Sequence, residues 1–383
     1  MSDDSSERIE PDTKDWTWVL DRPCPECGYV AGEVTMDRLA PAIRDNATDW
    51  EAHLAAPHVR DRPRAGVWST LEYAAHVRDA HRLFAERVRL MLAEDTPTFA
   101  NWDQDATAVA ERYRLQDPET VAAELLDAAD EAADVYESVP PGAWGRRGLR
   151  SDGSEFTVES IGRYHLHDAV HHLWDVRSAG RAATVAAYDG AAADYAAGTT
   201  EIGESLRSVM DRFLALVGPG CHVLEIGSGG GRDALALEAG RARVRRTDIT
   251  PAFAELLRGS GHEADVLDPL VDDLRDPAEP DRPYDAVWAS ACLLHVARED
   301  LPAVLRRLAE VTRRGGVLHV SLKEGDGEAW STHGRVAAPR LFVYWREEPL
   351  RAALGQAGWK VVEVGHADGL RGEVWLDVLA RRA

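Results

Sequence analysis

Lysine and cysteine are scarce in this chain of 383 residues. Only three lysines occur, so nearly all of the positive charge is arginine, a bias that we attribute to codon usage. Four cysteines are too few for a disulfide framework at this length. Runs of Lys or Arg are also missing, and the formal net charge of −22 would repel phosphate groups. These absences argue against a disulfide-stabilised scaffold and against a nucleic-acid partner.

Long apolar runs are missing as well. No segment reaches the roughly 18 uninterrupted apolar residues that would span a bilayer, and the acidic start Met1-Ser-Asp-Asp-Ser-Ser is not typical of a signal peptide. We therefore expect a soluble, cytoplasmic protein without a membrane partner. Residues 1–14 are polar and are predicted to form a disordered tail. The rest is longer than the roughly 250–300 residues at which a single core stops growing, so two domains are expected.

A glycine-rich turn in the second half is the strongest signal for a nucleotide-type cofactor. The apolar run His222–Ile226 predicts a buried strand, and residues 233–239 predict the helix that follows it. Gly227, Gly229 and Gly231 form the turn between them. Because glycine has no Cβ atom, it allows a sharp bend and lets a ligand lie directly on the main chain.

Two further carboxylates follow this turn. Residues 243–248 predict a second strand, and its last residue, Asp248, lies 21 positions after Gly227. A carboxylate about 20 residues after such a turn can hold the hydroxyls of a ribose. Asp265 lies farther along, in the segment His262-Glu-Ala-Asp-Val-Leu.

Together these features resemble the class I S-adenosylmethionine (SAM)-dependent methyltransferases, whose first turn carries the pattern E-x-G-x-G-x-G. That resemblance implies a Rossmann-like α/β fold, with Asp248 at the ribose and Asp265 beside the adenine. The cofactor contacts that it implies are Glu225, Gly227, Gly229, Gly231, Asp248 and Asp265. An NAD-binding domain and a glycine turn without a ligand are the alternatives. Glu225 argues against NAD, because dinucleotide-binding turns usually carry no acid at that place in the strand.

The first half is dominated by helical periodicity. Four segments carry it, at about 35–54, 69–93, 118–138 and 157–178. Ser69 and Glu72 have the spacing of a capping box, Asp117 precedes a proline at the first helical position, and Thr157 is a candidate cap. Four helices of about 20 residues each fit a four-helix bundle.

Histidines on the second and last of these helices predict a metal site. His167 and His171 are four residues apart, so both imidazoles project from one face of the helix. His76 could supply a third ligand from the facing helix. Three neutral imidazoles with one open position suit a catalytic Zn²⁺, Ni²⁺ or Fe²⁺ ion. Asp168 and His172 lie about 100° around the helix and are interpreted as supporting or surface groups.

The order of these elements, with Trp68-Ser-Thr-Leu-Glu-Tyr-Ala-Ala-His76 on one helix and H-x-x-x-H on the last, resembles the DinB/YfiT-like superfamily over about residues 15–180. That superfamily includes mycothiol-dependent maleylpyruvate isomerase, other thiol-dependent transferases and the amino-terminal part of the ergothioneine sulfoxide synthases. By this likeness His76, His167 and His171 bind a divalent metal. With a rotated helix, His165 or His172 would replace one member of the pair. A metal-free bundle used for docking or dimerisation is the alternative.

The pair Cys24-Pro-Glu-Cys27 has the spacing of half a zinc knuckle. No second C-x-x-C completes a Cys₄ site. A small loop staple or two free thiols is therefore favoured over a structural metal.

The second half continues as alternating strands and helices, which favours a doubly wound sheet with its ligands at the carboxyl ends of the strands. Residues 188–195 carry tyrosines among small residues and resemble the cofactor lid of class I methyltransferases. His295, in the loop after the fourth strand, is the group there that could take a proton near neutral pH, and packing against the next helix is its alternative role. Residues 325–345, with Arg340 and Tyr344, are expected to face the methyl acceptor.

The sequence therefore predicts two domains: a DinB-like four-helix bundle at residues 15–180 and, after a small-residue linker at 181–187, a class I methyltransferase domain at 188–383. The predicted function is methyl transfer from SAM to a small molecule, such as a thiol or an amine, beside a His-based site for a divalent metal. One alternative is a metal-dependent thiol transferase of the mycothiol type whose product the second domain methylates. The other is a non-catalytic bundle for docking or for a homodimer.

Overall fold

The computed structural model describes residues 15–56, 59–62, 66–332, 334–369 and 372–383. The predicted tail, residues 1–14, lies outside the described residues. The chain divides into two compact units, Met1–Ala179 and Gly180–Ala383, and each is described by itself.

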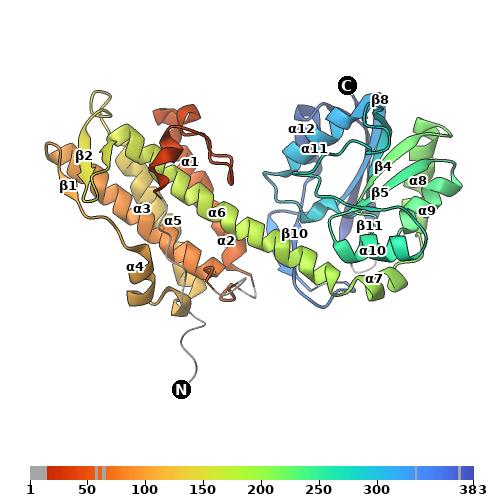
Figure 1. Cartoon of the computed structure of the whole chain (residues 1–383), viewed down its shortest axis with the longest axis horizontal. Coiled ribbons are helices and arrows are strands. Elements are labelled where there is room, and N and C mark those ends of the chain that lie inside the picture. The colour runs from red at the N-terminus through yellow and green to blue at the C-terminus, as the bar shows by residue number, and fades with distance from the viewer. Residues whose placement is uncertain (1–14, 57–58, 63–65, 333, 370–371) are drawn as a thin grey trace, which may run out of the picture. The chain divides into compact units, whose positions relative to one another are not determined.

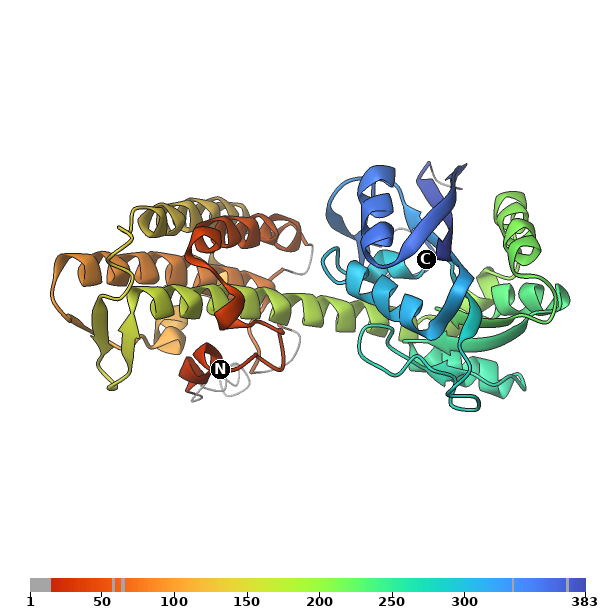
Figure 2. The ribbon, with the colours of Figure 1, turned by 90° about the horizontal axis from the view of Figure 1, so that it is seen from above.

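The first unit is a helical bundle, as predicted. Its long helices are α1 (Met36–Thr48), α3 (Thr70–Ala93), α5 (Pro118–Glu137) and the first part of α6 (Val158–Asp189), and both views show them side by side (Figures 1 and 2). Their apolar faces form one core, with Leu39, Leu71, Leu125, Ile161 and Leu166 among its buried residues. Shorter elements are α2 (Trp50–Leu54), α4 (Gln104–Ala110), η2 (Trp16–Leu20), η3 (Ala31–Glu33) and η4 (Tyr113–Leu115).

The predicted helix starts are confirmed. Ser69 and Glu72 make a full capping box at α3, Asp117 accepts from the main chain of Thr120 at α5, and Thr157 Oγ1 accepts from Ser160 N at α6. The helix expected at 35–54 is instead broken into α1 and α2 at Asp49.

Two local findings were not expected from the sequence. Residues 181–187, predicted to be a linker, lie within helix α6. The bundle also carries a small sheet of β1 (Thr98–Phe99), β2 (Arg147–Arg150) and β3 (Glu155–Thr157), in which β2 pairs parallel to β1 and antiparallel to β3. These strands are too short to produce a readable hydrophobic alternation.

The second unit is built on a seven-stranded sheet with the order β11-β12-β8-β7-β4-β5-β6. Strand β12 is antiparallel to both of its neighbours, and the strands from β8 to β6 are parallel. The strand bounds are β4 (His222–Ile226), β5 (Arg243–Asp248), β6 (Asp265–Val266), β7 (Tyr284–Ala289), β8 (Thr312–Lys323), β11 (Trp359–Asp368) and β12 (Val374–Arg382). A separate antiparallel pair is formed by β9 (Glu328–Ser331) and β10 (Arg340–Val343).

Helices cover both faces of this sheet (Figure 1). One core contains Leu224 and Val287 with α11 (Leu301–Val311) and α12 (Glu347–Gln356). The opposite core contains Val223 and Trp288 with α8 (Glu204–Val217) and α9 (Arg232–Ala239). Successive strand residues thus enter opposite cores, which explains why the central strands are apolar almost throughout. The remaining elements are α7 (Ala192–Gly198), α10 (Pro251–Gly259) and η5 (Leu293–His295).

Among the described residues, no helix is both long enough and apolar enough to cross a membrane.

Candidate cofactor site and metal clusters

The glycine-rich turn joins β4 to α9, as predicted. Gly227, Gly229 and Gly231 have φ angles of 72°, 52° and 82°, a region that residues with a Cβ atom rarely adopt. A Cβ atom at Gly227 would lie 2.4 Å from Cys292 Cβ, and one at Gly231 would lie 2.6 Å from Leu257 Cδ2. These two glycines therefore permit internal packing of the turn.

Gly229 differs from Gly227 and Gly231 because a Cβ atom placed there would clash with no neighbouring atom. The nearest atom to a Cβ placed there is Tyr195 Cε1, at 3.8 Å. Tyr195 belongs to α7, within the segment that was expected to act as a lid. A ligand can thus approach the main chain at Gly229, and this is the place in the turn that best fits a cofactor.

Gly227 permits packing of the turn and Gly229 faces the expected cofactor, so substitutions at the two positions should have different effects. Gly227→Ala combines an unfavourable φ with a clash against Cys292 Cβ, and we expect it to destabilise the second unit by about 3 kcal/mol or more. Gly229→Ala meets no such clash, so its main effect should be weaker SAM binding. Chemical denaturation and calorimetry on both variants check this contrast, and equal stability losses would contradict it.

Asp248, at the end of β5, lies beside the turn. Its Oδ2 accepts from Gly229 N at 2.9 Å, and its Oδ1 accepts from Thr250 N at 2.8 Å. Burial raises the pKa of this carboxyl group, although the two main-chain donors oppose the shift. Each oxygen retains a second lone pair, so the carboxylate can still accept hydroxyl groups of a ligand.

Glu225 lies beneath the turn rather than on its surface. Its side chain is buried and accepts from the hydroxyl group of Ser228. Ser228 Oγ in turn accepts from Thr247 N at 3.1 Å, which ties the turn to β5. Burial raises the pKa of Glu225 to about 8. The sequence had not pointed to Ser228, because a single serine between glycines is uninformative.

Asp265 is placed differently from the other predicted cofactor residues. Its carboxylate pairs with Arg245 Nε at 2.8 Å. It is in register with Thr247, whereas Val266 is in register with Asp248. Because in-register side chains share a sheet face, Val266 shares the face of Asp248 and Asp265 does not. The structure therefore links Glu225 and Asp248 to the turn, whereas the side chain of Asp265 lies on the other sheet face from that of Asp248.

His295 belongs to a chain of hydrogen bonds near the predicted lid. Its Nδ1 lies 2.6 Å from Leu341 O, and a carbonyl oxygen only accepts, so Nδ1 carries the proton. Nε2 then accepts from the hydroxyl group of Tyr188 at 2.9 Å, and that oxygen accepts from Arg340 Nη1 at 3.1 Å. Burial, with help from the charges of Arg340 and Lys323, lowers the pKa of His295 to about 4.

This chain lies next to aromatic side chains that lead to the turn. The ring of Tyr188 is 5.5 Å from that of Tyr195 and 6.3 Å from that of Phe253. Burial raises the pKa of Tyr188 to about 12, so Tyr188 and His295 are both neutral at physiological pH. The lone pair of Nε2 is directed at the hydroxyl group of Tyr188, so a proton can reach His295 through that group, although a pKa of about 4 makes His295 a weak base near neutral pH.

In the bundle, side chains of the types that can bind a metal ion gather in two clusters among the described residues. The first, here called the Cys–His cluster, consists of Cys24, Cys27, His167 and His171; the second, the Asp–His cluster, consists of His76, Asp168 and His172. Within each cluster the donor atoms all lie within 4.8 Å of one another. The three histidines predicted as ligands of one ion are thus divided between two clusters.

The division follows from helix geometry. Residues 167 and 171 share one face of α6, and residues 168 and 172 share a face about 100° away. The first face meets the segment before α1, and the second meets His76 on α3. His165, which was the other possible substitute for a member of the 167/171 pair, belongs to neither cluster. It forms hydrogen bonds with His81 Nδ1 at 2.8 Å and with the hydroxyl group of Tyr136 at 3.1 Å.

In the Asp–His cluster, both imidazoles lie close to the carboxylate of Asp168. His76 Nε2 is 3.5 Å from Asp168 Oδ2, and His172 Nε2 is 3.7 Å from Asp168 Oδ1. His172 Nδ1 lies 3.1 Å from Asp175 Oδ2, and this contact orients the ring. His76 is fully buried against Trp102, and burial lowers its pKa.

A cavity of about 790 Å³ opens beside this cluster in the bundle. Residues of both clusters line it, Asp168 and His172 from one and His167 and His171 from the other, together with aromatic side chains that include Trp68, Tyr73 and Trp102.

Comparison with protein families assigns both units. Residues 31–176 match the DinB superfamily model, and residues 223–316 match the methyltransferase domain model. The chain joins a DinB superfamily domain to a class I SAM-dependent methyltransferase domain. Both resemblances inferred from the sequence, and the enzyme class, are thereby confirmed. SAM is the cofactor of this methyltransferase family.

Solved structures of methyltransferases are similar to the second domain. The 1,6-didemethyltoxoflavin-N1-methyltransferase of Burkholderia thailandensis, solved with 1,6-didemethyltoxoflavin and S-adenosylhomocysteine, is 22% identical over 53% of this chain and 88% of its own, with a TM-score of 0.43. Magnesium protoporphyrin IX methyltransferase of Synechocystis PCC 6803 is 17% identical over 53% of this chain and 97% of its own, with a TM-score of 0.40. No curated protein matches the chain.

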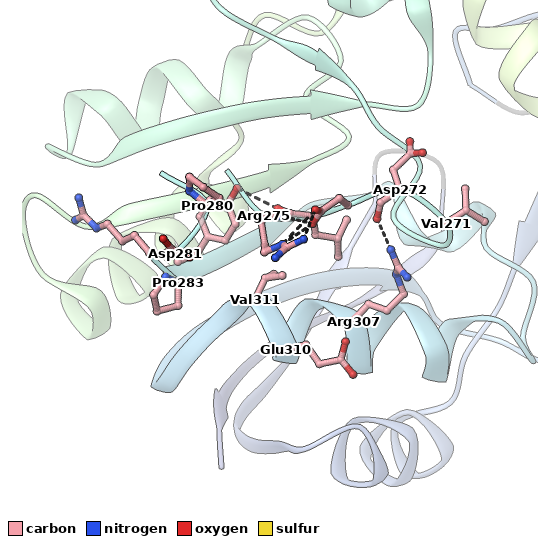
Figure 3. A pocket seen from close by; sticks show the side chains of 13 residues that line it. Val271, Asp272, Arg275, Pro280, Asp281, Pro283, Arg307, Glu310 and Val311 are labelled. Carbon is pink, nitrogen blue, oxygen red and sulfur yellow. Dashed lines mark hydrogen bonds and ion pairs between the residues drawn. The ribbon is translucent and has the colours of Figure 1, made fainter. Parts of the chain in front are cut away.

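The methyltransferase domain also has a cavity of about 540 Å³ between the loop after β6 and helix α11 (Figure 3). Its charged side chains interact locally: Arg275 pairs with Asp273 at 2.6 Å, and Arg307 donates to the main-chain oxygen of Asp272. This cavity shares no lining residue with the glycine turn, Asp248 or His295. We therefore assign it no part in methyl transfer.

Proposed function

We propose that the methyltransferase domain transfers a methyl group from SAM to an ionisable small molecule, with a thiol as the favoured class. The observation that carries this proposal is the hydrogen-bonded chain of Arg340, Tyr188 and His295, next to the aromatic side chains that flank the glycine turn. It provides a proton acceptor and positive charge beside the expected cofactor.

The fit to SAM is supported by the open side of Gly229 and by the adjoining carboxylate of Asp248. In this proposal Asp248 holds the ribose and Gly229 offers its main chain. Glu225 supports the turn from below through Ser228. Gly227 and Gly231 shape the turn, and Asp265 stays a prediction for the adenine. When bound, SAM supplies an electrophilic methyl group, and the domain must hold the nucleophile in line and exclude water.

The electrostatics around His295 favour an acceptor that loses a proton. Arg340 is buried, and its guanidinium lies 5.2 Å from the ring of Phe342; the ammonium of Lys323 lies 4.2 Å from the same ring. In this proposal the two nearby cations stabilise a thiolate more than a neutral amine. In this proposal His295 is the catalytic residue and accepts the proton through Tyr188. Because its pKa is about 4, the transfer requires that Arg340 and Lys323 lower the pKa of the bound thiol as well.

A metabolite screen tests this function directly. Purified full chain is incubated with methyl-labelled SAM and fractions of small molecules, and labelled products are separated and identified. We expect label on a thiol or another acidic group, with turnover reduced at least tenfold in His295→Ala and far less in His366→Ala, a surface histidine. Label confined to amines would overturn the acceptor class, and full activity of His295→Ala would overturn its role.

For the DinB domain we propose a divalent transition metal, Zn²⁺, Ni²⁺ or Fe²⁺, at the Asp–His cluster. Two imidazoles and one carboxylate with an open position are typical of catalytic rather than structural sites. The adjoining cavity favours one additional function, the activation of a thiol whose product the second domain methylates. The assignment of residues 15–180 and 188–383 to the two domains belongs to the same proposal.

Metal analysis separates this function from a bundle used only for docking or dimerisation. We expect His76→Ala to lose the metal of the Asp–His cluster, while His262→Ala, at a histidine outside both clusters, retains it. Two results together would favour the docking role. They are methyl transfer that is unchanged in metal-free protein and no thiol-transfer activity in metal-loaded protein, and they would contradict the proposed function of the Asp–His cluster.

A further inference from the structure

The Cys–His cluster brings together residues from two distant parts of the DinB domain. Cys24 and Cys27 lie in the segment before α1, and His167 and His171 lie on α6. We infer that these four side chains form a closed tetrahedral site for Zn²⁺, distinct from the Asp–His cluster. The inference does not depend on the proposed methyl transfer.

The spacing of the donor atoms matches a tetrahedral ion. Cys24 Sγ lies 3.7 Å from His171 Nδ1. With Zn–S bonds of about 2.3 Å and Zn–N bonds of about 2.0–2.1 Å, sulfur and nitrogen atoms of a tetrahedral site lie about 3.6 Å apart. The cluster thus needs little rearrangement to hold an ion.

Glu26 orients one of the two imidazoles. Its Oε2 lies 3.3 Å from His171 Nε2. A carboxylate at this nitrogen holds the proton on Nε2, so the lone pair of the ring is on Nδ1, the atom that faces Cys24. Carboxylate–histidine pairs of this kind commonly support metal-binding histidines.

His167 gives an independent indication of a ligand. Its side chain is 3% exposed, and among the described residues its Nε2 has no hydrogen-bond partner. A buried polar nitrogen without a partner is unfavourable by about 1–3 kcal/mol. A metal ion between His167 and its three neighbours would satisfy this nitrogen.

The local fold of the cysteine segment presents both thiols to α6. Cys24 N donates to Tyr29 O at 2.9 Å, and Gly28 N donates to Cys24 O at 3.0 Å. Gly28 has a φ of 73°, so glycine is favoured at the end of this turn. The ring of Trp16 packs beside the cluster, 4.8 Å from that of His171.

The donor set identifies both the ion and its role. Two thiolates and two imidazoles in a tetrahedron favour Zn²⁺, and four protein ligands leave no position for a substrate. The segment at 16–34 contains only short 3₁₀ helices, η2 and η3, in the part that the structure describes. An ion there would fasten this segment to α6, so the role is structural.

Metal content and cobalt spectroscopy test the site on the full chain. We expect about one tightly held Zn²⁺ per chain at this site. It should be lost in Cys24→Ser/Cys27→Ser and retained in His76→Ala and in Cys221→Ser, a matched buried cysteine of the methyltransferase domain. Wild-type protein reloaded with Co²⁺ should show tetrahedral visible bands and a thiolate-to-cobalt charge-transfer band, a readout that requires no variant to fold.

Three results would overturn the inference. They are unchanged zinc content in the double cysteine variant, no thiolate-to-cobalt band in the wild type, and a Cys24–Cys27 disulfide in protein purified under reducing conditions. Failure of the methylation screen would leave all three measurements unaffected, so the two proposals fail separately.

Discussion

Asp248→Ala should weaken SAM binding about 100-fold or more, as measured by isothermal titration calorimetry. Hydrogen bonds from ligand hydroxyls to a carboxylate each contribute about 1.5–3 kcal/mol, and the ribose offers two hydroxyls. The carboxylate is buried beside the turn, so water replaces its contribution poorly. The loss should appear in affinity for both SAM and S-adenosylhomocysteine, because the two share the ribose.

Controls separate this effect from damage to the turn. Asp281→Ala removes the same charge from an exposed loop and should leave the affinity unchanged. Asp248→Asn keeps the size of the side chain, and circular dichroism reports whether each variant is folded. Unchanged affinity in folded Asp248→Ala would remove the ribose assignment.

Glu225→Gln should stabilise the ligand-free methyltransferase domain above pH 8 by a few kcal/mol. Burial raises the pKa of Glu225 to about 8, and each pKa unit corresponds to about 1.4 kcal/mol. Below the ordinary pKa of about 4.3 the carboxyl group is protonated in both states and has no effect. As the pH rises toward 8, the unfolded chain releases this proton while the folded chain retains it, so the free energy of unfolding decreases.

Glutamine removes this dependence, since its amide does not titrate and can still accept from Ser228. Differential scanning calorimetry at pH 5 and pH 8.5 should show a smaller pH-dependent decrease of the domain's transition temperature in Glu225→Gln than in the wild type. Glu255→Gln, at an exposed glutamate, should retain the full decrease. Identical pH profiles for the wild type and Glu225→Gln would show that Glu225 is ionised in the folded state.

The fold of the methyltransferase half could be predicted from the sequence because its strands and its glycine turn produce local sequence patterns. The predicted bounds of the first two strands, 222–226 and 243–248, agree with β4 and β5 to the residue. The positive φ angles at Gly227, Gly229 and Gly231 agree with a tight turn. The position of the Asp265 side chain could not be predicted, because it depends on the pairing of a two-residue strand and on an ion pair with Arg245.

The grouping of the possible metal ligands could not be predicted from local sequence patterns. A four-residue spacing identifies both the pair 167/171 and the pair 168/172, but it does not tell which pair meets His76. That depends on the rotation of α6 in the bundle, which is determined by packing against α3 and the cysteine segment. For the same reason Cys24 and Cys27 seemed to lack further ligands, since their neighbours are about 140 residues away in sequence.

A crystal structure of the chain with S-adenosylhomocysteine tests the central claim most directly. We predict that the ribose hydroxyls bind Asp248, that the ligand lies on the main chain of Gly229, and that Tyr188 and His295 line the adjoining acceptor space. A ligand bound away from Asp248, or an acceptor space that excludes Tyr188 and His295, would contradict the account.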